Sequence, residues 1–254
     1  MAKRGKKKTE ISKIEKQEKV EEKNKENLSF KIPNFKQMFL KPKEFLNSVE
    51  KQEKYQPLIR DFVILYIFWF IISLIITTLV SKIPFNSELL SSAVLGFVNG
   101  IIFAVIAPFI LAGATHAILK IFKAKEGFFN TYKPVIYSLM IAIIYGFIML
   151  IAGLIIQFTM PIDVSMLQTI ITAQDQNVVI QAYKDYIGQP GAIILLFINL
   201  IAIIHIFIFS VLGLMKFQKI QKIKAIFAVL LSWIIIFALL VLLAILTSSQ
   251  AAIA

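Results

Sequence analysis

Two histidines, His116 and His205, lie in uncharged apolar stretches of this sequence. An imidazole in such a setting can bind a metal, relay a proton or hydrogen-bond to a neighbouring helix. If both helices cross a membrane in the same direction, His116 lies about 8–9 residues, roughly 12 Å, nearer the cytoplasm than His205. Direct pairing of the two rings is therefore not expected. We predict that His205 hydrogen-bonds across helices as a neutral ring, as Asn199 and Asn99 would, and we keep proton or metal chemistry at His205 as the alternative.

The residue types that intramembrane enzymes require are missing from the apolar stretches. No Asp, Glu, Lys or Arg lies inside any of them, so neither paired catalytic aspartates nor the charged groups of an ion-coupled carrier are available there. The sequence has no cysteine, no His-Glu-x-x-His and no glycine-rich phosphate loop. Ser138, Ser210 and Ser232 lack the Gly-x-Ser-x-Gly setting of a nucleophile. We therefore predict a protein without catalytic residues, a bound metal or a cofactor.

Small residues spaced by four form a stripe along the second apolar stretch. Its members are Gly96, Gly100, Ala104, Pro108 and Ala112. Small residues let helix backbones approach closely, so the stripe predicts packing inside a bundle, with homodimerisation as the alternative. Pro108 removes one backbone hydrogen bond near mid-span and is expected to kink the helix.

The elements that would position these groups begin with a basic N-terminal flank. Residues 1–57 hold 16 of the 27 Lys and Arg residues of a chain whose net charge is +12. Residues 1–27 have too few apolar side chains to pack and are predicted to be disordered. In 28–57 apolar and basic residues alternate, which predicts a short amphipathic helix at about 42–54, ended by Pro57, on the cytoplasmic leaflet. The predicted membrane-surface contacts are Lys41, Lys43, Phe45, Leu46 and Val49.

Five uncharged stretches follow, and each is long enough to cross a bilayer once but not twice. Lipid leaves no partner for the backbone of an open strand, so each stretch must be helical. We predict an all-α polytopic membrane protein whose five-helix bundle occupies 58–254. The predicted helices lie at about 61–82, 90–121, 133–159, 190–215 and 223–247.

Loop charge determines the predicted orientation of these helices. The loops after the second and fourth stretches carry four lysines each, whereas the loops after the first and third carry one each. The N-terminus is therefore predicted to be cytoplasmic and the C-terminus to lie outside. The long outer loop 159–190 is predicted to hold an amphipathic helix, capped by Asp175 and ended by Gly188 and Pro190. This helix would cover the bundle or lie on the outer face, with a binding cap as the alternative.

Short motifs in a fixed order carry a resemblance to a known family. Met38-Phe39-Leu40-Lys41-Pro42-Lys43-Glu44-Phe45 places a Pro and then a Phe just ahead of the first spanning helix. Gly127-Phe128-Phe129-Asn130-Thr131-Tyr132 leads to Tyr137-Ser138, and Lys222-Ile223-Lys224-Ala225-Ile226 opens the last helix. Over about residues 35–246 the chain resembles the Yip domain family, the Ypt/Rab-interacting membrane proteins and their prokaryotic relatives.

This resemblance implies five helices and a cytosolic N-terminus. For eukaryotic members it also implies roles in vesicle traffic with small GTPase partners. The Asp-Leu-Tyr-Gly-Pro signature of the eukaryotic proteins is absent from this sequence, and its Ile/Lys-rich, cysteine-free composition is similar to that of a prokaryotic relative. A prokaryotic relative would lie in the cell membrane.

We therefore predict a non-enzymatic integral membrane protein that organises partner proteins or lipids. Its expected contacts are the bilayer with its anionic headgroups and a cytosolic or membrane protein, and homo-oligomers are considered. Nucleic acid is not expected, because no nucleic-acid-binding motif accompanies the positive charge. Two alternatives stay open. One is an uncoupled channel or carrier for small solutes or lipids, with the stripe and His205 lining the path, and the other is an accessory subunit of a larger membrane complex.

Overall fold

The computed structural model describes residues 34–81, 87–160, 162, 163, 170 and 175–251, and all of the regular structure in these ranges is helical. The predicted disordered tail, residues 1–27, and residues 28–33 of the amphipathic segment lie outside these ranges. The helices are α2 (Phe35–Leu40), α3 (Pro42–Ser48), α4 (Tyr55–Ser81), α5 (Ser87–Ile121), α6 (Phe129–Thr159), α8 (Gln176–Gly188), α9 (Pro190–Phe217) and α10 (Lys222–Ala251).

Five helices, α4, α5, α6, α9 and α10, are long and apolar enough to cross a membrane. The predicted all-α fold with five spanning helices is thus confirmed. The largest difference lies ahead of the first span: α3 ends at Ser48 rather than near residue 54, and α4 begins at Tyr55. Pro57 falls in the first turn of α4, where the N–H that proline lacks has no helical partner to lose. It therefore helps to start a spanning helix and does not end a surface helix.

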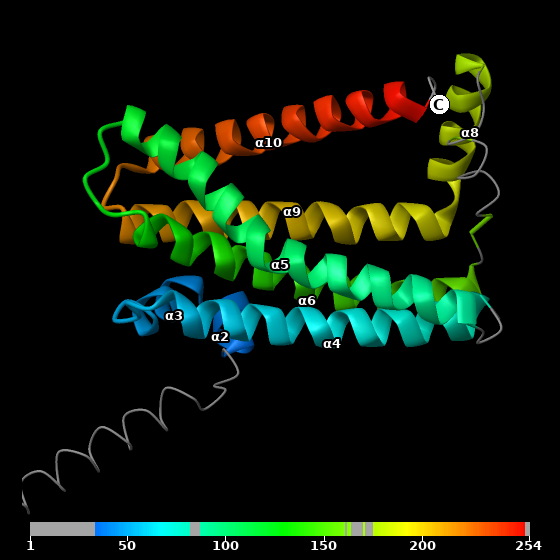
Figure 1. Cartoon of the computed structure of the whole chain (residues 1–254), viewed down its shortest axis with the longest axis horizontal. Helices are drawn as coiled ribbons and strands as arrows, with labels where there is room; N and C mark the ends of the chain where they lie inside the picture. Colours follow the sequence, from blue (N-terminus) through cyan, green and yellow to red (C-terminus); the bar gives the residue numbers. More distant parts are fainter. Residues whose placement is uncertain (1–33, 82–86, 161, 164–169, 171–174, 252–254) are drawn as a thin grey trace, which may run out of the picture.

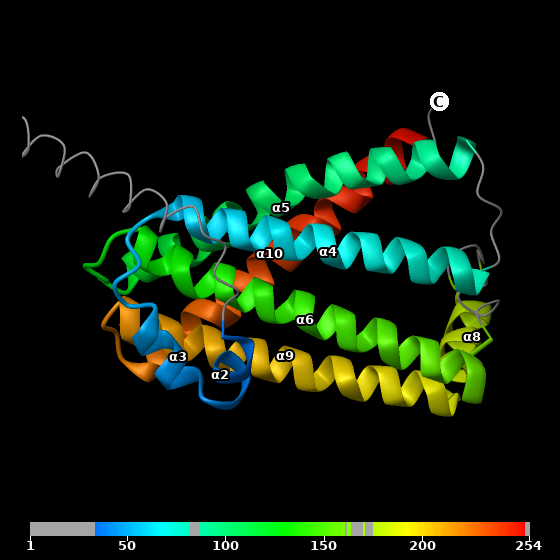
Figure 2. The same ribbon diagram turned by 90° about the horizontal axis from the view of Figure 1, so that it is seen from below.

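The spanning helices form one bundle. α6 packs against α4, α5 and α9, while α10 packs against α5 and α9 (Figures 1 and 2). The connections 122–128 and 218–221 lie at one end with α3, and α8 lies at the other end (Figure 1). We call the first of these the basic end, because of the lysines in and beside its two loops. These are Lys120, Lys123, Lys125, Lys216, Lys219, Lys222 and Lys224.

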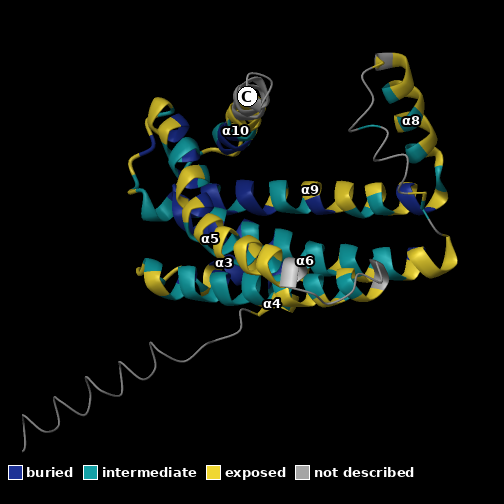
Figure 3. Cartoon of the chain, turned by 45° about the vertical axis from the view of Figure 1, so that its right-hand side comes forward, coloured by how far each residue is buried: buried dark blue, intermediate teal, exposed yellow. Residues whose placement is uncertain are grey.

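Burial is concentrated toward the basic end (Figure 3). In α9 most residues of 209–217 are buried, whereas Ala202 is the one buried residue within 193–204. In α6 the buried residues likewise gather in the first thirteen positions, up to Ile141. The rest of the bundle exposes large apolar side chains such as Phe68, Phe197 and Phe237, which is the surface that hydrocarbon solvates.

Two features of the spanning helices follow from single residues. Figure 1 shows α5 changing direction near its middle, where the buried Pro108 withholds a backbone N–H. Gly213 of α9 faces Pro134 of α6 so closely that a side chain at position 213 would overlap the proline ring. The missing side chain is what lets these two helices approach.

α8 runs across the end of the bundle opposite the basic end (Figures 1 and 3). Asp175 caps it by accepting a hydrogen bond from the Asn177 amide, and Gly188 is its last residue, as predicted. Pro190 then opens α9 directly. α8 packs on α9, and none of its described residues is buried, so it lies at the outer end of the bundle, and the choice between the two predicted placements stays open.

Candidate interaction site

The short helices α2 and α3 pack onto the bundle beside α6 and α9. Phe45 directs its ring edge at Tyr137, with centroids 5.0 Å apart, and lies 6.0 Å from Phe209. Met38 and Leu46 are buried in the same apolar cluster. Helices of six and seven residues are not stable alone, so contact with α6 and α9 is what holds this pair in its helical form.

This packing corrects part of the predicted membrane contact. Phe45 and Leu46 are only 2% and 1% exposed, so lipid does not reach them, and Val49 packs against the same cluster. The spacing of apolar residues identified the apolar face of α3. It did not show whether that face contacts lipid or other helices, because both accept apolar side chains equally well. Lys41 and Lys43 are exposed, and Lys41 pairs with Glu44 at 3.0 Å.

α2 lies beside the middle of α9 and not at its basic end. The ring of Phe39 lies 4.8 Å from His205 and 5.5 Å from Tyr145. His205 is twelve residues from the end of α9, or about 18 Å along the helix. The segment is therefore a wedge beside the spanning helices, whereas the sequence predicted a helix lying flat on the leaflet.

His205 makes the predicted hydrogen bond across helices. Its Nδ1 lies 3.2 Å from the Tyr145 hydroxyl of α6. Asn199 and Asn99 are instead exposed, with no hydrogen-bond partner in the described part of the chain, so the predicted bonds from these two amides are not formed. Six residues separate positions 199 and 205, a rotation of about 240° on a helix. Asn199 therefore points away from the α6 interface that holds His205.

His116 belongs to a separate polar network near the basic end. Its Nδ1 lies 2.8 Å from Thr131 Oγ1, which also accepts a hydrogen bond of 2.8 Å from the Gln218 amide nitrogen. That amide can only donate, so the Thr131 hydroxyl accepts from Gln218, while the direction of its bond to His116 follows the tautomer of the imidazole. The network ties α5, α6 and the residue that follows α9 together, and it does not involve His205.

Lys133 is the most unusual residue of the basic end. It is only 3% exposed, yet its ammonium group has no carboxylate partner among the described residues. The ammonium donates instead to the backbone carbonyl of Glu50 at 3.0 Å and lies 4.5 Å from the ring of Phe217 and 5.2 Å from that of Phe129. A carbonyl dipole and two aromatic faces thus stabilise the charge.

Sequence reasoning treated Lys133 only as a loop charge. The signal that could have identified it is the spacing Phe129-x-x-x-Lys133, which places a lysine over an aromatic ring on one helix face. The partners Glu50 and Phe217 lie 83 and 84 positions away along the chain, and no local pattern identifies them.

Two further ion pairs lie at the basic end. Lys216 contacts the Glu50 carboxylate at 3.1 Å and also hydrogen-bonds to Asn47, so α9 holds the end of α3 from a second side. Lys219 pairs with Glu126 at 2.8 Å and joins the two loops. The hydrogen bond and charge of Lys219 lower the pKa of the Glu126 carboxyl, and Glu126 in turn raises the pKa of Lys219.

The small-residue stripe of α5 faces its own bundle. Gly100 is covered by the Tyr66 ring of α4, whose hydroxyl occupies the space a side chain would need, whereas Gly96 touches the Phe70 ring and is itself exposed. Ala104 and Ala112 are buried, with exposed fractions of 3% and 0%. This arrangement leaves little of the stripe available to a second copy of the chain.

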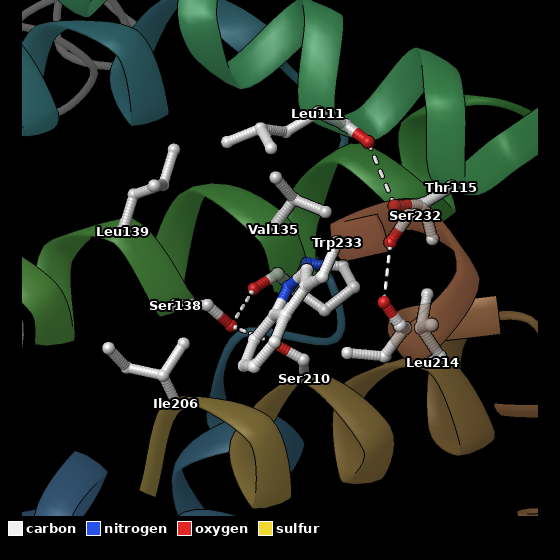
Figure 4. Close-up of a pocket in the computed structure, with 12 residues that line it drawn as sticks. Leu111, Thr115, Val135, Ser138, Leu139, Ile206, Ser210, Leu214, Ser232 and Trp233 are labelled. Carbon is white, nitrogen blue, oxygen red and sulfur yellow. Dashed lines mark hydrogen bonds between the residues drawn. The ribbon is translucent and has the colours of Figure 1, made fainter. Parts of the chain in front are cut away.

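A small cavity lies between α5, α6, α9 and α10 (Figure 4). The Ser138 and Ser210 hydroxyls meet there at 2.7 Å, and Ser138 also donates to the Pro134 carbonyl. The volume of about 60 Å³ has room for one or two waters. Its lining contains no imidazole, carboxylate or amine, so nothing there would activate a serine as a nucleophile.

Comparison with known proteins agrees with the geometry. The family model described as the Yip1 domain matches residues 36–244, from α2 through nearly all of α10. No curated protein and no solved structure matches the chain. The matched region includes the docked helix pair as well as the five spans, so the pair is part of the domain itself. The chain therefore belongs to the Yip1 domain family, and it is an integral, multi-pass membrane protein.

Proposed function

We propose that this protein is a non-enzymatic organiser of partner proteins at the membrane, and that the outer face of α2 and α3 is its working surface. The observation that carries the proposal is the docking of this helix pair. Its apolar face is buried in the bundle, while Lys43, Glu44 and Glu53 on the outer side are exposed. A surface held rigid before binding loses less conformational entropy when a partner arrives.

The anchors of the pair support a role beyond packing. Lys133 and Lys216 both hold Glu50, one through the backbone and the other through the carboxylate. These contacts fix the end of α3 against α6 and α9. The outer face consequently keeps a constant orientation relative to the bilayer, as a docking surface for a membrane-associated partner requires.

Loop charge supports a cytosolic position for this surface. The basic end carries the lysine-rich loops, and lysines concentrate on the cytoplasmic side of membrane proteins. We therefore place the N-terminus in the cytoplasm and the end that carries α8 outside. A cysteine introduced at the exposed Lys123 should be labelled by an impermeant maleimide only after the membrane is opened.

The test is quantitative co-purification in native-lipid particles. The full chain is compared with a triple variant, K43E/K51E/K54E, that reverses charge on α3 and on the connection 49–54 that follows it, while leaving the buried side untouched. K184E, on exposed α8 at the opposite end, is the control. We expect a stoichiometric protein that is lost from the triple variant and retained by the control.

Two outcomes would count against the proposal. If the unmodified chain brings down only lipid and copies of itself, no partner exists to be organised. If a partner survives the triple variant, it binds elsewhere, as it would for an accessory subunit held through the spanning helices. The channel or carrier alternative has less support, because the stripe is packed on α4 and Phe39 covers one side of His205.

A further inference from the structure

The two loops of the basic end enclose a cleft of about 320 Å³. It opens just beyond the last turns of α5 and α9 and the first turn of α10. Four lysines line it, Lys123, Lys125, Lys219 and Lys224, together with one acidic residue, Glu126. The volume equals about ten waters at roughly 30 Å³ each, so a phosphate group fits with part of a larger headgroup.

Most of the positive charge in this cleft is uncompensated. Glu126 pairs with Lys219 at 2.8 Å, which neutralises one lysine. Lys123, Lys125 and Lys224 have no ion pair anywhere in the described part of the chain. Like charges brought together in this way repel one another, and an anion in the cleft would remove that repulsion.

The backbone adds a second and independent observation. Lys123 and Lys219 have φ angles of 61° and 51°, and they are the two non-glycine residues with positive φ among the described residues. Each closely follows the end of a spanning helix, where glycine is the usual residue. At the end of α5 the Ala124 amide donates to the Leu119 carbonyl at 3.0 Å, which closes the turn around Lys123.

A lysine in this left-handed conformation strains the backbone where glycine would not. Both of the strained lysines line the same cleft. The ion pair with Glu126 gives Lys219 a structural role, but the ammonium group of Lys123 has no ion pair among the described residues, so the turn gives no reason for a lysine at position 123. The side chain itself is what the position retains, and strain of this kind gathers at binding sites.

The lining also includes an uncharged polar residue, Gln218. Gln218 is 2% exposed, and its amide nitrogen donates to Gly127 and Thr131. Its amide oxygen is buried without a hydrogen-bond partner among the described groups. Gln218 therefore braces the wall of the cleft through its amide nitrogen, and its buried oxygen takes no part in the proposed contact.

We propose that this cleft binds the phosphate of an anionic lipid headgroup. The apolar neighbours favour a lipid over a free anion: Ile121 and Ile223, which adjoin the cleft at the ends of α5 and α10, are 77% and 55% exposed. Large apolar side chains beside a lysine cluster, level with the helix ends, match the boundary between acyl chains and headgroups. This site does not rest on the partner proposal, since it involves neither α2 nor α3.

The full-length protein is tested by native mass spectrometry after reconstitution in phosphatidylcholine that contains either phosphatidylinositol 4-phosphate or phosphatidylglycerol. The cleft variant is K123Q/K125Q/K224Q. The control, K16Q/K19Q/K23Q, removes the same charge from the N-terminal tail, outside both the cleft and the α2–α3 surface. We expect the cleft variant to lose on the order of tenfold or more in retained anionic lipid, and the control less than about twofold.

K123G separates binding from folding. Glycine should relieve the strained turn, so this variant should melt at a higher temperature than the unmodified chain and yet retain less anionic lipid. Equal losses in the cleft and control variants, or none in either, would overturn the site. Binding of soluble pyrophosphate without selective retention of anionic lipid would overturn the lipid assignment.

Discussion

Lys133 carries a positive charge in a buried position, where the Glu50 carbonyl and the rings of Phe129 and Phe217 stabilise it. Its stem also fills space between α6 and α9. Replacement by methionine should keep most of that volume and remove the charge. The Glu50 carbonyl would then lose its donor, and the end of α3 would be held by Lys216 alone.

We expect K133M to lower the free energy of unfolding by about 1.5–3 kcal/mol, the usual contribution of a hydrogen bond from a charged donor. Amide exchange within 42–52 should accelerate more than in the middle of α6. K184M, at an exposed position of α8, is the matched control and should change neither quantity. Unchanged exchange in the 42–52 segment of K133M would mean that Lys133 does not anchor it.

The Glu126–Lys219 pair predicts how stability depends on pH. The pKa of Glu126 is lowered in the folded protein, so its contribution is complete above the pKa of the unfolded carboxyl, about 4.3, and disappears as pH falls through the folded value. The pKa of Lys219 is raised, so its contribution is complete below about 10.4 and disappears at higher pH.

Thermal melts should therefore show a constant stabilisation by this pair between about pH 5 and 9, and a loss of that stabilisation at the acid end. K219Q should remove the part of the acid loss that belongs to Glu126, and K125Q, which breaks no ion pair, should leave it. High salt should shrink the difference, because Lys219 is exposed and Glu126 is half-buried. A K219Q protein with an unchanged acid profile would contradict the assignment.

At the scale of the elements, α6 and α9 depend on one missing side chain. Gly213 lies against the Pro134 ring, which is rigid and cannot turn aside. Gly113 of α5, in contrast, has nothing within 4 Å of the position a side chain would take. The same substitution at the two sites should therefore have opposite results.

We expect G213A to destabilise the protein by about 1–3 kcal/mol through overpacking. G113A should be neutral or stabilise it by roughly 0.5–1 kcal/mol, since alanine is the better helix former. Denaturation of the purified protein in matched detergent would measure both. Similar stabilities for the two variants would mean that the helices separate at little cost.

The helix pair α2–α3 also marks where sequence reasoning stopped. The alternation of apolar and basic residues identified an amphipathic segment, and burial of Phe45 and Leu46 shows that the apolar face was assigned correctly. The partner of that face was not predictable, because Tyr137 and Phe209 lie far away along the chain. A helix start marked by a capping residue could be predicted from the sequence alone, as it was for Asp175 at the start of α8.

At the scale of the whole molecule, the five spans were predictable because hydrocarbon imposes one solution on any long uncharged stretch. The site was much less accessible to such reasoning. His205 was singled out correctly as a cross-helix donor or acceptor, whereas Lys133 and Gln218 were not. Their roles depend on which loops meet at the basic end, and a charge pattern along the sequence carries no information on that.

The depth of the α2 wedge has a consequence for the surrounding bilayer. Phe39 lies beside His205, and from there to the start of α9 is fifteen residues, about 22 Å. Lys36 on α2 and Lys41 directly after it are exposed, and their charges must reach water or headgroups. Only about 22 Å of α9 lies between the level of Phe39 and the other end of the helix. Hydrocarbon about 30 Å thick would therefore bury the two lysines on this side of the protein.

The bilayer beside α2 must therefore be thinner than elsewhere around the bundle, with water and headgroups drawn down toward the lysines. Melting in bilayers of increasing acyl-chain length should show the highest stability in short-chain lipid, and K36L/K41L should move that optimum toward longer chains. An optimum unaffected by these substitutions would place the wedge outside the hydrocarbon altogether. A one-sided hydrophobic mismatch of this kind favours a thinner bilayer.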